Sequence, residues 1–137
     1  ILDQLPENLA VESFLVLGQG ELVGKPTAKV LRARSYEVQT AIAQTPNKAE
    51  LLKKATVIIT GVGKAKVLAG DEISKGVIVI DAGTSESGGS IQGDVDFASV
   101  APKARYITPS PGGVGPVTVA KLLENVWKVA LYKQGKS

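Results

Sequence analysis

Residues 13–26 read SFLVLGQGELVGKP, a short apolar run that passes into a glycine-rich loop and then into the start of a helix. A short apolar run that ends at glycine is typical of a strand buried in a parallel sheet. Pro26 stands near the helix start, where a missing N–H group costs nothing. A strand, a glycine loop and a helix in this order favour a site for the diphosphate of a dinucleotide, because free N–H groups at the helix start face the anion.

The glycines of this loop are Gly18, Gly20 and Gly24, a spacing one residue longer than G-x-G-x-x-G. The first allows a tight turn, the second removes a side chain beside the diphosphate, and the third lets helix and strand pack closely. The residues at the end of the expected second strand, 41–45, read AIAQT. They include neither a carboxylate for the 2′-hydroxyl of NAD nor an arginine for the 2′-phosphate of NADP. These residues alone therefore predict a dinucleotide site of undetermined preference.

The same alternation of apolar runs and helical segments continues along the chain. We expect further strands over 36–42, 56–60, 76–81 and 105–108, and a loop or small hairpin over 85–94. We expect helices over 24–34, over 47–54 with Asn47 as its cap, near Asp71, after Asp96 with that residue as its cap, and over 117–132. This order predicts an α/β fold, a Rossmann-like doubly wound and mainly parallel sheet with helices on both faces. The expected domain covers 13–137, and 1–12 is read as a linker or arm.

The segment 117–132 has the clearest helical period. Its apolar residues fall on one face, which we expect to be part of the core: Val119, Leu122, Leu123, Val126, Trp127 and Ala130. Glu124 and Lys128 lie opposite and form a supportive i,i+4 pair.

Composition excludes several classes of function. The 137 residues suit one domain and contain no cysteine and no histidine, which excludes disulfides, thiolate nucleophiles, Ser-His-Asp triads and structural zinc sites. A net charge of +3 is too weak to indicate a nucleic-acid protein, and we interpret Lys25, Lys29, Arg32 and Arg34 as the solvated face of one helix. No apolar run reaches the roughly 18 residues of a membrane helix. We expect a cytoplasmic protein with no metal, and, since the chain begins at Ile1, a piece of something longer.

Residues 109–118 read PSPGGVGPVT and are followed by Leu122, Leu123 and Asn125. This stretch closely resembles the signature of the bifunctional methylenetetrahydrofolate dehydrogenase/methenyltetrahydrofolate cyclohydrolase family. The glycine loop, GVGK at 61–64, DAG at 81–83 and GDVDF at 93–97 match that family's motifs in the same order. The resemblance implies the carboxyl-terminal NAD(P)-binding half of an enzyme of one-carbon metabolism, with 1–12 as a linker or arm from a missing amino-terminal catalytic domain.

In that family, hydride passes from 5,10-methylenetetrahydrofolate to NAD(P)+ and water then gives 10-formyltetrahydrofolate. The resemblance implies that the folate derivative and the catalytic lysine belong to the missing amino-terminal half. It therefore implies no catalytic residue in this chain, an inactive fragment, and a homodimer. One alternative is a stand-alone or degenerate dinucleotide-binding module without catalysis. Another Rossmann oxidoreductase is a further alternative, against which the 109–118 stretch argues.

The resemblance also implies which residues meet the ligands. The cofactor-binding set is Gly18, Gln19, Gly20, Leu22, Val23, Thr45, Gly61, Val62, Gly63, Thr84, Gly113 and Thr118. The folate-binding set is Pro111, Gly112, Gly113 and Val114. Gln19 replaces a commonly basic residue, and Ala43 lies in a stretch that is polar in the family, so both usual contacts with a 2′-phosphate are weakened. This predicts that NAD binds at least as well as NADP, and NADP binding about tenfold tighter would reject it.

Overall fold

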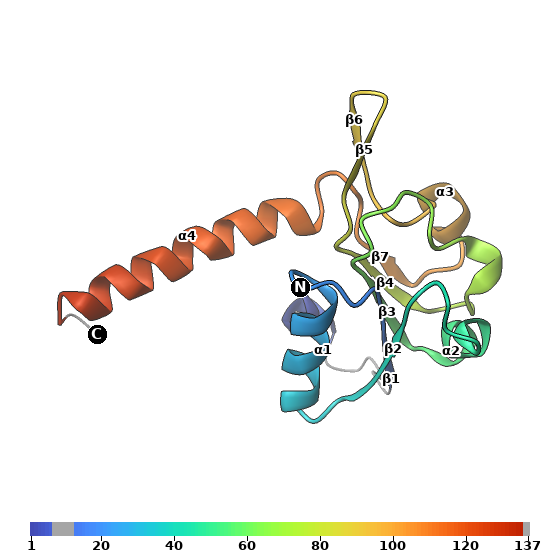
Figure 1. Cartoon of the computed structure of the whole chain (residues 1–137), viewed down its shortest axis with the longest axis horizontal. Coiled ribbons are helices and arrows are strands. Elements are labelled where there is room, and N and C mark those ends of the chain that lie inside the picture. The colour runs from blue at the N-terminus through green and yellow to red at the C-terminus, as the bar shows by residue number, and fades with distance from the viewer. Residues whose placement is uncertain (7–12, 136–137) are drawn as a thin grey trace.

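Five parallel strands form the central sheet, in the order β2-β1-β3-β4-β7 (Figure 1). The computed structural model describes residues 1–6 and 13–135. The strands are β1 (Ser13–Leu17), β2 (Glu37–Ala41), β3 (Val57–Thr60), β4 (Ile78–Asp81) and β7 (Tyr106–Ile107). Leu17 pairs with both Ala41 and Thr60, and Thr60 pairs with Asp81, so four strands end at one edge of the sheet. The order reverses between β1 and β3, which is the switch point where such sheets bind ligands.

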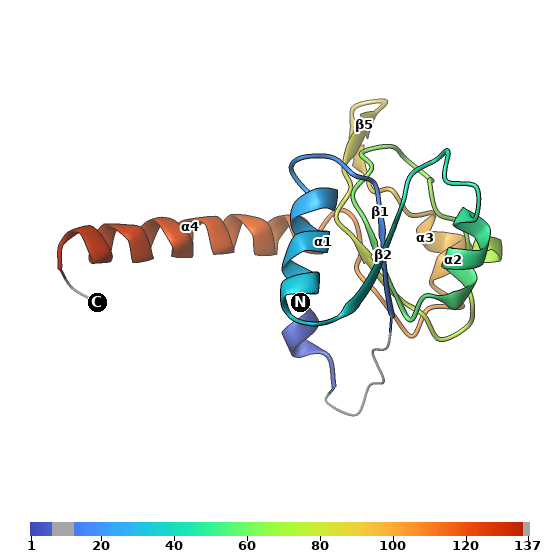
Figure 2. The ribbon, with the colours of Figure 1, turned by 60° about the horizontal axis from the view of Figure 1, so that its bottom comes forward.

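Helices cover both faces of this sheet, as predicted (Figure 2). One face carries α1 (Gly24–Ala33), and the other carries α2 (Lys48–Lys54), α3 (Phe97–Val100) and the 3-10 turn η2 (Gly70–Glu72). The strands alternate between the two cores: Phe14 packs with Leu31 of α1, and Leu15 packs with Leu52 of α2. Each buried strand therefore shows an almost continuous apolar run.

The segment before β1 contains the short 3-10 helix η1 (Leu2–Gln4). Leu2 and Leu5 pack against the core on the α1 face, and Asp3 forms an ion pair with Arg34 at 3.2 Å. The remaining residues of the predicted arm, 7–12, lie outside the described residues. The four basic side chains of 25–34 are exposed, as expected for a solvated helix face.

Two predicted helix caps occupy the right positions but make no capping contact. Asn47 precedes α2 and Asp96 precedes α3, yet neither side chain accepts a hydrogen bond from its helix. Asn47 has φ −98° and ψ 22°, which is not the extended conformation that aims a capping side chain at the first turn.

The predicted small hairpin is present as β5 (Ser85–Ser87) and β6 (Ser90–Gln92), which pair antiparallel.

The last helix, α4 (Val114–Lys133), forms where a helix was predicted, but the expected burial of its apolar face is wrong. The helix projects away from the sheet (Figures 1 and 2) and has no buried residue. The exposed fractions lie between 59% and 65% for Val119, Leu122, Leu123, Val126 and Trp127, and Ala130 is exposed as well. A 3.6-residue period identifies an apolar face but not its partner. Here α1, Leu2 and Leu5 cover the α1 face of the sheet, and of α4 only Val114 packs there.

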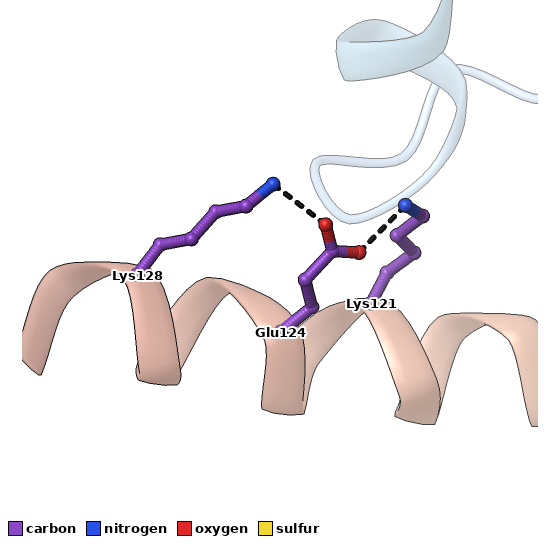
Figure 3. A network of polar contacts seen from close by, with 3 residues as sticks. All are labelled: Lys121, Glu124 and Lys128. Carbon is purple, nitrogen blue, oxygen red and sulfur yellow. Dashed lines mark hydrogen bonds and ion pairs between the residues drawn. The ribbon is translucent and has the colours of Figure 1, made fainter. Parts of the chain in front are cut away.

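The predicted Glu124–Lys128 pair is present and has a third member. The ammonium groups of Lys121 and Lys128 each lie 2.6 Å from a carboxylate oxygen of Glu124 (Figure 3). Hydrogen bonds from both lysines, reinforced by their charges, lower the pKa of Glu124 to about 2.

Although α4 has 20 residues, neither it nor any other helix among the described residues is both long and apolar enough to span a bilayer.

We expect the Glu124 carboxyl to titrate well below the ordinary range for glutamate, as measured by ¹³C NMR. A lowered folded pKa means that the pairing stabilises the helix above the ordinary pKa and is lost as the pH falls toward about 2. Replacing both partners, Lys121→Met with Lys128→Met, returns the midpoint toward 4.5, the ordinary value. A midpoint already near 4.5 in the unmodified protein would contradict the pairing.

Candidate functional site

The loop between β1 and α1 depends on two of its glycines for its shape. Gly18 has φ +91°, and a Cβ there would lie 2.7 Å from the carbonyl oxygen of Gly61. A Cβ on Gly24 would lie 2.0 Å from the carbonyl oxygen of Gly18, so the helix start and the strand end touch through backbone. A Cβ on Gly20 would meet no atom within 4 Å. The geometry thus fits the sequence-based roles: a tight turn, an open position and a close contact.

This loop also presents backbone donors that the protein leaves free. Within residues 1–6 and 13–135, no group accepts a hydrogen bond from the N–H of Gln19 or Gly20. The Gln19 side chain folds back, and its Nε2 donates to the carbonyl oxygen of Gly18 at 2.7 Å. Free N–H groups just before a helix suit an anion.

A cavity of about 280 Å³, here called the β2-side cavity, opens at the carboxyl ends of β1, β2 and β3. Its lining residues are Leu17, Gly18, Gln19, Gly20, Ala41, Ile42, Ala43, Gln44, Lys48, Gly61, Val62 and Val67. Five residues of the predicted cofactor set lie here, namely Gly18, Gln19, Gly20, Gly61 and Val62. Lys48, which sequence reasoning did not select, comes from α2.

A second cavity of about 660 Å³, the β4-side cavity, lies between the end of β4 and the 109–118 loop. The predicted residues that line it are Leu22, Val23, Thr84, Pro111, Gly112, Gly113, Val114 and Thr118. The loop is tightly folded, since a Cβ on Gly113 would lie 2.3 Å from the carbonyl oxygen of Pro109. The glycine loop contributes to both cavities, Gly18–Gly20 to one and Leu22–Val23 to the other.

Two predicted cofactor residues, Thr45 and Gly63, line neither cavity. The Thr45 hydroxyl accepts a hydrogen bond from the N–H of Ile42 at 2.9 Å and closes the turn after β2. The N–H of Gly63 donates to a carboxylate oxygen of Asp94. Thr45 thus holds Ile42, which lines the β2-side cavity, and Gly63 directly follows Val62, which also lines it.

Asp94 holds the loop that follows β3. Its carboxylate accepts hydrogen bonds from three successive N–H groups, those of Val62 at 2.6 Å and of Gly63 and Lys64 at 3.0 Å. The side chain is fully buried. The pKa of the Asp94 carboxyl is raised, mainly because the group is buried, and the nearby charge of Asp81 raises it further. The hydrogen bonds from the three N–H groups act in the opposite direction. The donors of 62–64 are therefore already occupied by an internal anion, and Gln19 and Gly20 remain for an external one.

Asp81 in turn holds the backbone of Asp94. Its carboxylate accepts the Thr60 hydroxyl at 3.0 Å and the N–H groups of Gly83, Asp94 and Val95 at 3.0–3.1 Å. A Cβ on Gly83 would lie 1.9 Å from the Asp94 carboxyl carbon, so DAG and GDVDF pack directly against each other. Sequence reasoning matched these motifs without assigning them a role. The available signal was an aspartate at the end of an apolar strand, with a glycine two residues later.

The lining of the two cavities suits binding and orientation rather than proton transfer. Among the described lining residues, only Lys48 and Asp81 carry ionisable side chains, and Asp81 is saturated with donors. No cluster of three or more acidic side chains that could hold a metal exists in ranges 1–6 and 13–135.

Comparison with known proteins agrees with this arrangement. Residues 1–134 match the family model described as the tetrahydrofolate dehydrogenase/cyclohydrolase, NAD(P)-binding domain. The bifunctional protein FolD 2 of Lactobacillus johnsonii is 44% identical over 124 residues, which are 90% of this chain and 44% of that protein. The chain thus spans less than half the length of this curated relative.

Solved structures give the same result. The bifunctional FolD enzyme of Campylobacter jejuni superposes with a TM-score of 0.84 at 38% identity, covering 90% of this chain and 45% of the other. The Trypanosoma brucei enzyme, complexed with NADP cofactor and inhibitor, gives a TM-score of 0.79 at 33% identity over 90% of this chain and 44% of its own. Matched along almost its whole length by the family model, the chain belongs to the NAD(P)-binding domains of the tetrahydrofolate dehydrogenase/cyclohydrolase family.

Proposed function

We propose that the chain binds NAD(P) across the glycine loop, with the diphosphate at Gln19 and Gly20. The observation that carries this is the pair of free N–H groups at an open glycine, on the loop that lines both cavities. A dinucleotide has two halves joined by a diphosphate, which suits two cavities on either side of one loop with free N–H groups. The adenosine half then occupies the β2-side cavity and the nicotinamide half the β4-side cavity.

The wider proposal is that this domain is the dinucleotide-binding half of a methylenetetrahydrofolate dehydrogenase/methenyltetrahydrofolate cyclohydrolase. When bound, the cofactor would supply the hydride acceptor, and the protein's share would be to bring nicotinamide and folate together. The 109–118 loop forms the outer wall of the β4-side cavity, which supports a role at that contact. The folate derivative is held mainly by an amino-terminal half, which also supplies the catalytic groups. A homodimer stays a prediction.

Isothermal titration calorimetry of the chain with NAD+ and NADP+ tests the site. We expect saturable one-to-one binding of at least one dinucleotide. Gly20→Val places a branched side chain in the space proposed for the diphosphate, so affinity falls at least about tenfold while the melting temperature holds. Ala33→Val introduces the same valine side chain at the exposed far end of α1, away from the loop, and as the control leaves affinity unchanged. If Gly20→Val binds as tightly as the unmodified chain, the diphosphate does not lie there.

A further inference from the structure

Lys48 is placed where a dinucleotide would present its adenosine ribose. The residue after a Rossmann second strand meets the ribose 2′ position. Here β2 ends at Ala41, and Ile42, Ala43 and Gln44 line the β2-side cavity without offering any charge. Lys48, four residues after Gln44, lines the same cavity from α2. Among the described lining residues of this cavity, it alone carries a charge.

The surroundings of Lys48 hold its side chain without using its donors. The side chain is 21% exposed, and its ammonium lies 3.8 Å from Oε1 of Glu72. That separation exceeds a hydrogen bond, so the contact is an ion pair that leaves the ammonium N–H groups available. Glu72 is itself held, because its Oε2 accepts the N–H of Ala69 at 2.8 Å. Glu72 is absent from the cavity lining, so no carboxylate faces the ribose position.

We propose that Lys48 is a specificity-determining residue that binds the 2′-phosphate of NADP and gives this domain a preference for NADP over NAD. An ammonium whose N–H groups are free of hydrogen bonds, in a cavity lined by no carboxylate, favours a phosphate, whereas the 2′-hydroxyl of NAD gains little from it. The sequence departures at Gln19 and Ala43 predict the opposite preference. Lys48 supplies from the next helix the positive charge that those positions lack. The inference rests on the proposed dinucleotide site and names its ligand more closely.

Calorimetric titration with NADP+ and NAD+ separates the possibilities. Lys48→Met keeps the apolar stem and removes the charge, so NADP+ affinity falls about tenfold while NAD+ affinity changes less than about twofold. Lys48→Arg retains the preference for NADP+. Lys54→Met removes the same charge from an exposed position on the same helix and leaves both affinities unchanged. The fragments 2′,5′-ADP and 5′-AMP, titrated in parallel, repeat the contrast at the adenosine end alone.

Each outcome decides one question. If the unmodified chain prefers NADP+ and Lys48→Met loses that preference, the assignment of Lys48 holds. If the NADP+/NAD+ affinity ratio is the same in the unmodified chain and in Lys48→Met, the assignment is overturned while the dinucleotide site stands. If the unmodified chain binds neither dinucleotide, the proposed function itself fails and Lys48 loses its ligand with it.

Discussion

Asp94→Ala lowers the free energy of unfolding by about 3 to 5 kcal/mol and abolishes measurable dinucleotide binding. Three N–H groups, those of Val62, Gly63 and Lys64, lose the acceptor that they have among the described residues, and the space of the carboxylate is left empty beneath the loop. Because Gly61 and Val62 form part of the β2-side cavity, loss of the loop shape also removes a wall of the cofactor site. Urea denaturation measures the first effect and calorimetric titration the second.

Asp96→Ala is the matched control, with the same chemical change two residues further along. The Asp96 side chain makes no capping hydrogen bond, and we expect the free energy of unfolding to change by less than about 1 kcal/mol. If Asp94→Ala is no more destabilising than Asp96→Ala, the carboxylate does not hold the loop.

Gly24→Ala is expected to lower the free energy of unfolding by about 2 to 4 kcal/mol, a large cost for one added methyl group. That methyl would lie 2.0 Å from the carbonyl oxygen of Gly18 and 3.0 Å from Cα of Gln19. Both neighbours are backbone atoms of the turn, so relief requires α1 to move away from β1. The same movement shifts the N–H groups of Gln19 and Gly20, and dinucleotide affinity falls with stability.

The control is Gly20→Ala in the same loop. Its added methyl meets no protein atom within 4 Å, so the free energy of unfolding stays within about 0.5 kcal/mol of the unmodified chain. If urea denaturation shows Gly24→Ala and Gly20→Ala to be equally destabilising, the loop can move to accept a methyl group, and close packing at Gly24 is not required.

The sheet could be predicted from sequence because each of its central strands is an uninterrupted apolar run. The run 13–17 forms a strand with the predicted bounds, and the runs in 56–60 and 76–81 form strands one or two residues shorter. Strands of this kind are buried on both faces, so their sequence changes sharply where they end. The glycine loop could be predicted equally well, because its glycines recur at a characteristic spacing in the sequence between a strand and a helix.

The residues that hold the site together were harder to predict. Asp81 and Asp94 are 13 residues apart, and only the folded chain places the N–H of Asp94 against the Asp81 carboxylate at 3.1 Å. Lys48 was missed for a related reason, because its place in the cavity depends on how α2 crosses the end of β2. Contacts between distant segments leave no periodic signal, whereas strands and helices do.

The exposed last helix gives the chain an optical reporter of its own. Trp127 is the single tryptophan of the sequence, 65% of it is open to water, and it lies 13 residues into α4. At a rise of 1.5 Å per residue, its indole is carried roughly 20 Å along the helix from the point where α4 leaves the sheet. Tryptophan fluorescence, excited selectively over that of the three tyrosines, therefore reports on this helix alone, and its emission wavelength records whether the indole is exposed to water or covered.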